Sequence, residues 1–197
     1  MSLLPLFPLD VVLLPGVPLP LHIFEPKYRE MIGECLQDKS QFGVVRAQEE
    51  GVAPIGCTAE IVAVTKNYDD GRMDIVTQGR ERFELVELNH DRSFLRGEVV
   101  YLADEPGKPE ANELAKAVQL HQEILALAGA QQDLADDSDF PLSYQMAGSL
   151  PLDLDFKQTL LSMRSEGERI QAISKYFETV RRAVIARHKA SGNGHAH

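Results

Sequence analysis

The sequence predicts an α+β protein, with a β-rich N-terminal half that contains one helix and an α-helical C-terminal half. Two observations carry this prediction. From Phe42 to Leu102 apolar and polar residues alternate with period two, which is typical of strands with one buried face. Beyond Pro109 the apolar spacing changes to three and four, which is typical of amphipathic helices. Several short strands in one half of a chain favour a small barrel or a folded-over sheet.

The composition is that of an ordinary globular protein, with 197 residues, 44% of them hydrophobic and 25% charged. This length fits one or at most two small domains with a core that needs no disulfides. The formal net charge of −10 disfavours nonspecific binding to nucleic acids and to anionic membranes. Cys35 and Cys57 have no CxxC spacing, so we interpret them as small buried hydrophobes in a reducing compartment. No export signal or membrane span is apparent, which predicts a cytoplasmic protein.

The first 26 residues hold six of the eleven prolines, interleaved with apolar residues. Proline cannot donate to a strand ladder, so this segment should form short extended pieces joined by turns. Pro26 suits the first turn of a helix, and the apolar residues after it predict a helix over about 25–38.

The β-rich half contains two turn signals. Asp69-Asp70-Gly71 predicts a hairpin, and Gly79 to Phe83 predicts a second sharp reversal or a bulge. A final strand is expected from Phe94 to Leu102.

A linker over Ala103–Pro109 separates the two halves. After it, an apolar stripe from Leu114 to Ala128 predicts a long helix, and Ser138 or Asp139 can cap the next one. A short helix should carry Phe156, Leu160 and Met163, and the capping box of Ser165 and Glu168 should open the last helix. We therefore expect a β-rich domain over 1–105, a helical bundle over 106–190 and a disordered tail over 191–197.

The segment from Arg164 to Lys189 holds seven basic and three acidic residues, a net +4 that leaves −14 for the rest of the chain. Such a stripe is typical of a solvated helix surface that docks on an acidic body.

Sequence motifs for catalysis are missing. There is no phosphate-binding loop with its lysine, and no serine lies in a G-x-S-x-G elbow. A Ser/His/Asp triad scattered along the chain stays open, because triads are recognised by geometry. We interpret His22 and His121 as hydrogen-bonded structural residues, and the acidic stretch 133–139 as helix caps. His195 and His197 lack a rigid third ligand, so neither a metal nor a cofactor is predicted.

Taken together, the proline and glycine motifs closely resemble the Lon protease N-terminal domain over about residues 4–188. The N-terminal motifs that carry the resemblance are Leu4–Leu9, Val12–Gly16 and Leu19–Tyr28. The later ones are Phe42–Val45, Ile55–Ile61, Asp70–Arg72, Gly79–Phe83, Leu150–Leu152, Lys157–Leu161 and Glu168-Arg169. In the family's full-length protease this domain precedes an ATPase and a Ser-Lys protease domain, and this chain is expected to lack both.

The resemblance implies a PUA-like β pseudo-barrel followed by a helical bundle. It also implies noncatalytic binding of unfolded or tagged polypeptides, as an adaptor or holdase, with a protease or a chaperone as a further partner. The predicted peptide-binding residues are apolar side chains outside the core stripes: Tyr68, Met73, Leu142 and Tyr144. Two alternatives stay open, namely recognition of a small molecule or degron, and RNA binding through the PUA-like fold.

Overall fold

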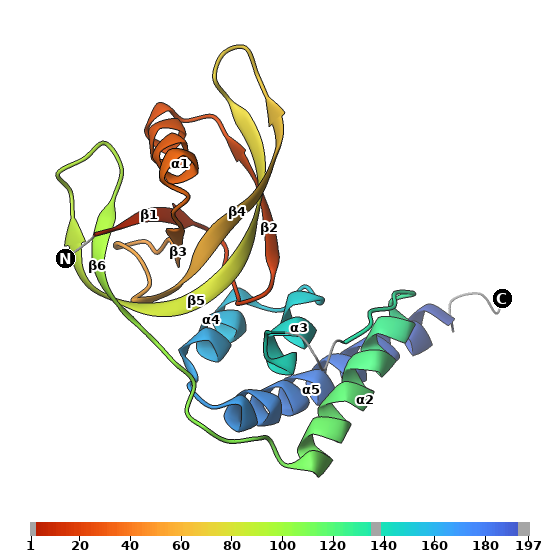
Figure 1. Ribbon diagram of the computed structural model, residues 1–197. Coiled ribbons are helices and arrows are strands. Elements are labelled where there is room, and N and C mark those ends of the chain that lie inside the picture. Colours follow the sequence, from red (N-terminus) through yellow and green to blue (C-terminus); the bar gives the residue numbers. More distant parts are fainter. Residues whose placement is uncertain (1–2, 135–138, 193–197) are drawn as a thin grey trace. The chain divides into compact units, whose positions relative to one another are not determined.

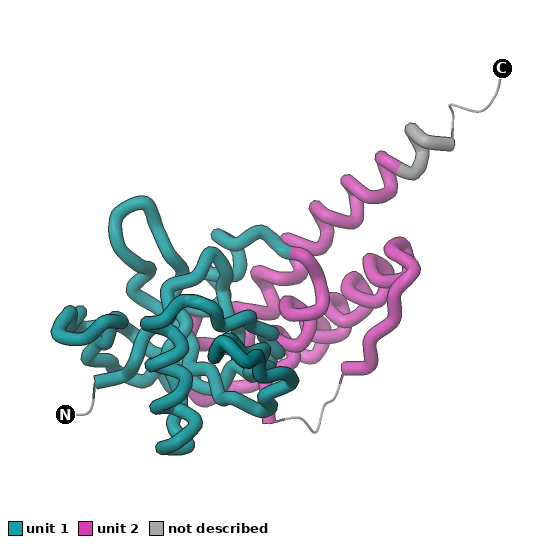
Figure 2. The backbone as a smooth tube through the Cα atoms, turned by 90° about the horizontal axis from the view of Figure 1, so that it is seen from above, with its two compact units in different colours: residues 1–103, 152–162 teal, residues 104–151, 163–197 magenta. Residues whose placement is uncertain are grey.

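The computed structural model describes residues 3–134 and 139–192, and these residues confirm the predicted α+β class. They form six strands and five helices, and the chain divides into two compact units (Figure 2). Unit 1 contains the residues up to Ala103 together with Leu152–Ser162. Unit 2 contains Asp104–Pro151 and the residues from Met163 onward.

All six described strands lie in unit 1 (Figure 1). They are β1 (Leu4–Leu9), β2 (Pro18–Ile23), β3 (Phe42–Arg46), β4 (Ile55–Asn67), β5 (Met73–Asn89) and β6 (Arg96–Tyr101). The strand order is β2-β5-β4-β3-β1-β6, and β6 pairs again with β5. Every strand except β2 therefore belongs to a closed barrel, and β2 is an edge strand added to β5. Only β1 and β3 pair in parallel.

The helix predicted over about 25–38 is α1 (Pro26–Asp38), with Pro26 at its start and Lys39 in the left-handed conformation at its end. It buries Met31, Ile32 and Cys35. The spacing of these three residues explains why the sequence indicated an amphipathic helix here.

Of the two alternatives predicted for Gly79–Phe83, the sharp reversal is wrong, because β5 continues through this segment as one strand of 17 residues. The predicted bulge is confirmed, since Cys57 pairs with Arg82 whereas Ala59 pairs with Gly79. Gly79 is required by a close approach of the backbone. A Cβ atom there would lie 2.2 Å from the Leu14 carbonyl oxygen.

The helix expected around Phe156 to Met163 is α4 (Leu154–Ser162), and it belongs to unit 1 although its neighbours in sequence belong to unit 2. Gln158 Nε2 donates a hydrogen bond to the Ile55 carbonyl at 2.9 Å. Arg82 Nη1 donates to the Leu161 carbonyl, also at 2.9 Å. The periodicity of a helix shows which face is apolar but not which body covers it, so a domain limit drawn from sequence alone could not place α4.

Unit 2 contains α2 (Ala111–Leu127), α3 (Leu142–Gly148) and α5 (Glu166–Gly192). Pro141 precedes α3, so Asp139 is not its cap, and Ser138 lies outside the described residues. Half of the predicted capping box is present, because the Glu168 backbone N–H donates to Ser165 Oγ at 3.5 Å. α5 runs beyond the expected start of the tail at 191, and residues 193–197 lie outside the described residues.

The net-positive last helix is joined to α2 by two ion pairs. Arg181 Nη1 lies 2.7 Å from Glu123 Oε2, and Lys116 Nζ lies 2.9 Å from Glu178 Oε1. Exposed pairs of this kind each contribute little to the free energy of unfolding, because solvent screens them. They nevertheless show that part of the stripe is neutralised inside unit 2.

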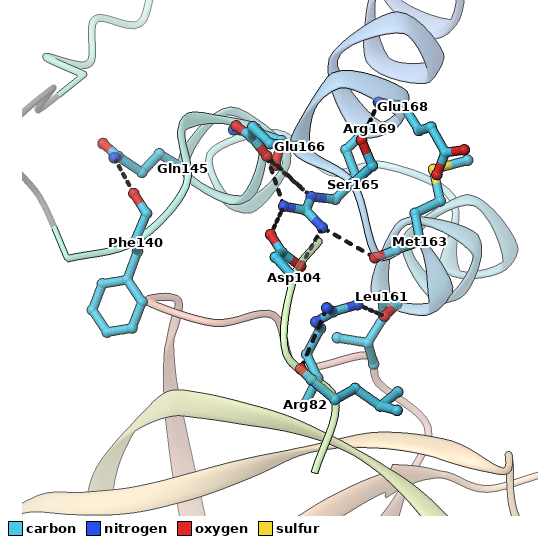
Figure 3. Close-up of polar contacts among 12 residues, drawn as sticks. Arg82, Asp104, Phe140, Gln145, Leu161, Met163, Ser165, Glu166, Glu168 and Arg169 are labelled. Atoms are coloured by element: carbon cyan, nitrogen blue, oxygen red, sulfur yellow. Dashed lines mark hydrogen bonds and ion pairs between the residues drawn. The ribbon is translucent and has the colours of Figure 1, made fainter. Parts of the chain in front are cut away.

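Arg169 lies fully buried at the start of α5 and binds three separate stretches of unit 2 (Figure 3). Its guanidinium pairs with both carboxylate oxygens of Asp104, with Glu166 Oε2 at 2.8 Å and with the Met163 carbonyl at 3.0 Å. It also donates to Ser143 Oγ of α3 at 2.9 Å. Burial alone would lower the pKa of Arg169, but the hydrogen bonds to Asp104 and the nearby negative charges raise that pKa further above its usual range.

His121 of α2 is also fully buried, stacked on Phe177 of α5 with ring centroids 5.9 Å apart. Ser149 Oγ donates to the Met146 carbonyl at 2.9 Å and so accepts a hydrogen bond from His121 Nε2, at 2.7 Å. His121 Nδ1 has no hydrogen-bond partner among the described residues. Burial lowers the pKa of this imidazole, because the charged form would be desolvated with no counter-ion.

We predict that Arg169→Met lowers the free energy of unfolding by about 3 kcal/mol, because it leaves two carboxylates without their buried cation. Lys116→Met is the matched control, since it breaks an exposed pair and should lower the free energy of unfolding far less than Arg169→Met does. Urea denaturation of the full chain measures both. Equal losses in the two variants would show that Arg169 is no more important than a surface cation.

We also predict that stability falls as the pH is lowered from 7 to 5. The unfolded chain binds a proton on His121 near the ordinary pKa of about 6.5, whereas the folded chain resists protonation until a lower pH. His121→Leu should therefore flatten the dependence of the free energy of unfolding on pH. The exposed His90→Gln is the control and should leave the slope as in the wild type; a wild-type slope in His121→Leu contradicts the prediction.

Candidate functional site

Three paired strand segments form an arm of unit 1, in which the β4–β5 hairpin extends beyond the barrel (Figure 1). β2 pairs with the first half of β5, and the same half of β5 pairs on its other side with the second half of β4. Directly paired residues share a face of a sheet, so the rows His22–Asp74–Lys66 and Pro20–Val76–Ala63 lie on one side. We call this side the outer face of the arm. It carries Pro20, His22, Phe24, Ala63, Lys66, Tyr68, Asp74 and Val76.

Asp74 organises the polar part of the outer face. His22 Nδ1 lies 2.5 Å from Asp74 Oδ1, and the Tyr68 hydroxyl donates to Asp74 Oδ2 at 2.9 Å. The hydrogen bond from His22 and then that from Tyr68 lower the pKa of Asp74 below its ordinary value, and the charge of Lys66 acts in the same direction. The carboxylate therefore contacts two ring-bearing side chains, one from β2 and one from the residue that follows β4.

Aromatic rings gather around this carboxylate. Phe24 is 57% exposed and stacks on His22 with ring centroids 5.9 Å apart. The Tyr68 ring meets His22 edge-on at 5.7 Å, and Lys66 Nζ lies 4.5 Å from the Tyr68 centroid. The outer face therefore offers the exposed Phe24 ring stacked on the hydrogen-bonded His22, with a cation beside Tyr68.

The structure separates the two residues predicted near the hairpin. Tyr68 belongs to the outer face, whereas Met73 pairs with Ile23 and Asn67 and so points to the opposite side of the arm. Met73 is half-buried there, and its neighbours Ile23 and Ile75 on that side are buried.

The other two predicted residues lie in α3 of unit 2. Tyr144 is only 2% exposed, and the Arg169 guanidinium lies 4.5 Å from its ring centroid. Its side chain is therefore part of the unit 2 core and does not offer a surface to a ligand, which corrects the expectation. Leu142 is half-buried at the first position of α3.

Sequence reasoning missed Phe24, and it interpreted His22 as a hydrogen-bonded structural residue; the hydrogen bond to Asp74 is present, but His22 lies on an exposed face. The sequence did carry a signal for a shared face, because His22 and Phe24 flank Ile23 with the period of two that a strand has. In the structure Ile23 is buried, and the two flanking residues face solvent. Without the structure, the side of the strand that faces solvent could not be chosen, because this proline-rich edge strand holds a single polar residue, His22, to mark it.

Unit 1 also contains a cavity of about 600 Å³ between α1, β6 and the start of β1. Its wall includes Glu34, Asp38, Glu81, Arg96 and Tyr101. Arg96 is paired with Asp91, so acidic groups dominate the wall. None of the predicted site residues lines this cavity.

Two thiols and the side chains that could ligate a metal remain to be placed. Cys35 and Cys57 are both buried and free, and burial raises the pKa of Cys57 to about 12. Within residues 3–134 and 139–192, no group of three or more His, Cys, Asp or Glu side chains could hold a metal ion. In the same part of the chain, no helix combines the length and the apolar character that crossing a membrane requires.

The architecture is that of the N-terminal domains of Lon proteases. A Lon N-terminal domain protein from Xanthomonas campestris superposes with a TM-score of 0.69 at 25% identity, covering 87% of this chain and 96% of that one. The N-terminal domain of the Mycobacterium avium complex Lon protease gives a TM-score of 0.68 at 19% identity, which shows a shared fold. It covers 90% of this chain and 98% of that one.

The chain belongs to the family of ATP-dependent protease La (LON) substrate-binding domains, whose model matches residues 3–178. The resemblance inferred from the proline and glycine motifs is thus confirmed. Lon protease 1 of Hydrogenovibrio crunogenus is 28% identical over 188 residues, which are 86% of this chain and 23% of that protein. The Lon protease of Parabacteroides distasonis is 39% identical over 110 residues, 51% of this chain and 13% of that protein. The chain therefore spans less than a quarter of the length of these curated relatives.

We predict that His22→Asn raises the pKa of Asp74, because it removes the first of the two hydrogen bonds that stabilise the carboxylate. Carbon-detected NMR titration of the aspartate carboxyl groups measures the shift. Asp70 is the internal control, because Arg72 rather than His22 lowers its pKa. An unchanged Asp74 titration would show that the His22 contact does not persist in solution.

Proposed function

We propose that this chain is a noncatalytic polypeptide-binding module that takes unfolded or tagged polypeptides on the outer face of the arm. The observation that carries the proposal is the exposed ring of Phe24 beside the half-buried ring of Tyr68, in a chain of the substrate-binding family. An aromatic ring that is half exposed in the free protein gains apolar contact when a client covers it.

The geometry of the arm supports recognition rather than catalysis. The Tyr68 hydroxyl donates a hydrogen bond to Asp74, the carboxylate that His22 also contacts. A hydroxyl engaged in this way is not activated by the imidazole, so the cluster positions rings for contact. The rigid placement of these rings reduces the entropy that binding would otherwise cost.

An adaptor or holdase role follows from this surface. A module that binds exposed apolar segments can keep a client from aggregating or present it to a protease or chaperone. Apolar and aromatic contacts discriminate weakly between sequences, which suits a module that meets many clients. The acidic net charge of −10 argues against RNA as the ligand.

We predict that Phe24→Ser combined with Tyr68→Ser weakens binding of a fluorescein-labelled, reduced and carboxymethylated protein by about tenfold, because two apolar contacts are lost. Val86→Ser is the matched control. Val86 is 60% exposed but belongs to the second half of β5, outside the arm. Fluorescence anisotropy gives the affinity, and circular dichroism confirms that each variant is folded.

Two results would contradict the proposal. If the wild-type chain neither binds the labelled client nor suppresses its aggregation, the polypeptide-binding function fails. If Val86→Ser weakens binding as much as the double variant does, the function stands but the outer face of the arm is not the contact surface.

A further inference from the structure

The second half of β4 has an unpaired edge. β4 pairs with β5 along its whole length. On its other side, β4 pairs with β3 only where Cys57–Ala59 of β4 lie opposite Phe42–Val44 of β3. Among the described residues no strand pairs with the other side of β4 beyond Ala59. Residues 62–67 are all exposed, so the backbone N–H and C=O groups along this side are available to another extended chain.

The arm has a second free edge, on β2, and the sequence treats the two edges differently. β2 carries Pro18 and Pro20, and a proline can be tolerated in a sheet only where its missing N–H would have faced away from the neighbouring strand. The free edge of β2 therefore lacks backbone N–H donors at Pro18 and Pro20. β4 has no proline from Ile55 to Asn67, and it exposes Val62 by 50% and Val64 by 37% along the open part.

Two register shifts limit how long a partner strand can be. They lie between Ile61 and Ala63 and between Val64 and Lys66 of β4. Bulges bend an edge and interrupt its ladder, and natural proteins use them to prevent open-ended sheet growth. An added strand can therefore pair only over a few residues, which favours weak, reversible capture of a short segment.

We propose that residues 61–67 of β4 capture an extended, proline-free apolar segment of a client polypeptide by strand addition. This inference rests on the proposed function and specifies how the client is held. Unpaired strand groups are satisfied best by another extended backbone, so the partner is an extended peptide. A strand added here would lie beside Ala63 and Lys66, both of the outer face, so the captured segment would continue the same surface.

A second copy of this chain is the competing occupant of the β4 edge. Two chains that each carry a net charge of −10 repel one another, and the edge itself offers only one charged residue, Lys66, from Ile61 to Asn67. A client segment without that excess of negative charge pairs with the edge at no such electrostatic cost. The observations thus favour a client over self-association.

The test compares two lysine-flanked, fluorescein-labelled peptides of alternating valine and threonine. One is unmodified, and the other is N-methylated at every second residue, so it keeps the side chains and the charge but loses ladder donors. We expect about tenfold weaker binding of the N-methylated peptide, because two or three backbone hydrogen bonds of about 0.5–1.5 kcal/mol each are lost. Amide hydrogen exchange should slow in residues 61–67 when the unmodified peptide binds.

Variants of the edge supply the second readout. Val62→Lys combined with Val64→Lys should weaken binding of the unmodified peptide about tenfold, since lysines along an edge disfavour strand pairing. Val86→Lys, at the bulge between Leu85 and Glu87 of β5, is the matched control and should bind as the wild type does.

The outcomes separate this inference from the proposed function. If both peptides bind equally well and the β4 amides stay unprotected, strand addition is wrong, although the module still binds polypeptides. If the β4 amides become protected with rising protein concentration alone, and sedimentation shows a dimer, a second copy occupies the edge and the inference is overturned. If neither peptide nor the unfolded client binds, the proposed function fails as well.

Discussion

The buried guanidinium of Arg169 is the interaction on which unit 2 depends. It binds Asp104 and Met163, the first residues of the two chain segments that make up unit 2, through the Asp104 carboxylate and the Met163 carbonyl. It also donates to Ser143 of α3. Glu166, one turn before Arg169 on α5, completes the pairing and also accepts from the Ser143 backbone N–H at 3.0 Å. A lysine could not make these contacts, because they need a planar group with several donors in fixed directions. The contacts of Arg169 thereby fix how α3 and α5 are arranged within unit 2, where the described residues form no sheet that would hold the helices together.

Unit 1 is organised by a different constraint, which is the length of β5. One strand of 17 residues pairs with β2 over Met73–Gln78, with β4 over Met73–Glu84 and with β6 over Phe83–Asn89, so it belongs both to the arm and to the barrel. The barrel buries Phe83 of this strand, whereas the arm leaves much of its surface in solvent. Because β5 runs from the arm into the barrel, the packing around Phe83 in the barrel also holds the arm in place. The arm therefore needs no core of its own.

The exposed arm is the surface on which we propose that this member of a substrate-binding family holds a polypeptide. Its outer face presents Phe24 and Tyr68 around the Asp74 carboxylate, and its β4 edge presents unpaired backbone groups beside them. Side-chain contact supplies apolar attraction, and backbone pairing supplies direction without demanding a particular sequence. Both kinds of contact suit a domain whose family is defined by substrate binding.

The sequence by itself determined the fold class, the helix that starts at Pro26, the Asp69–Gly71 hairpin and the family, because each depends on local backbone geometry or on apolar periodicity. Only the tertiary structure decided that Gly79 marks a close approach rather than a reversal, and that α4 packs in unit 1. It also decided that Tyr144 is buried while Phe24 is exposed. The physical reason is that periodicity identifies the apolar face of an element but not what covers it. Burial, and hence the candidate site, depends on contacts between residues far apart in the chain.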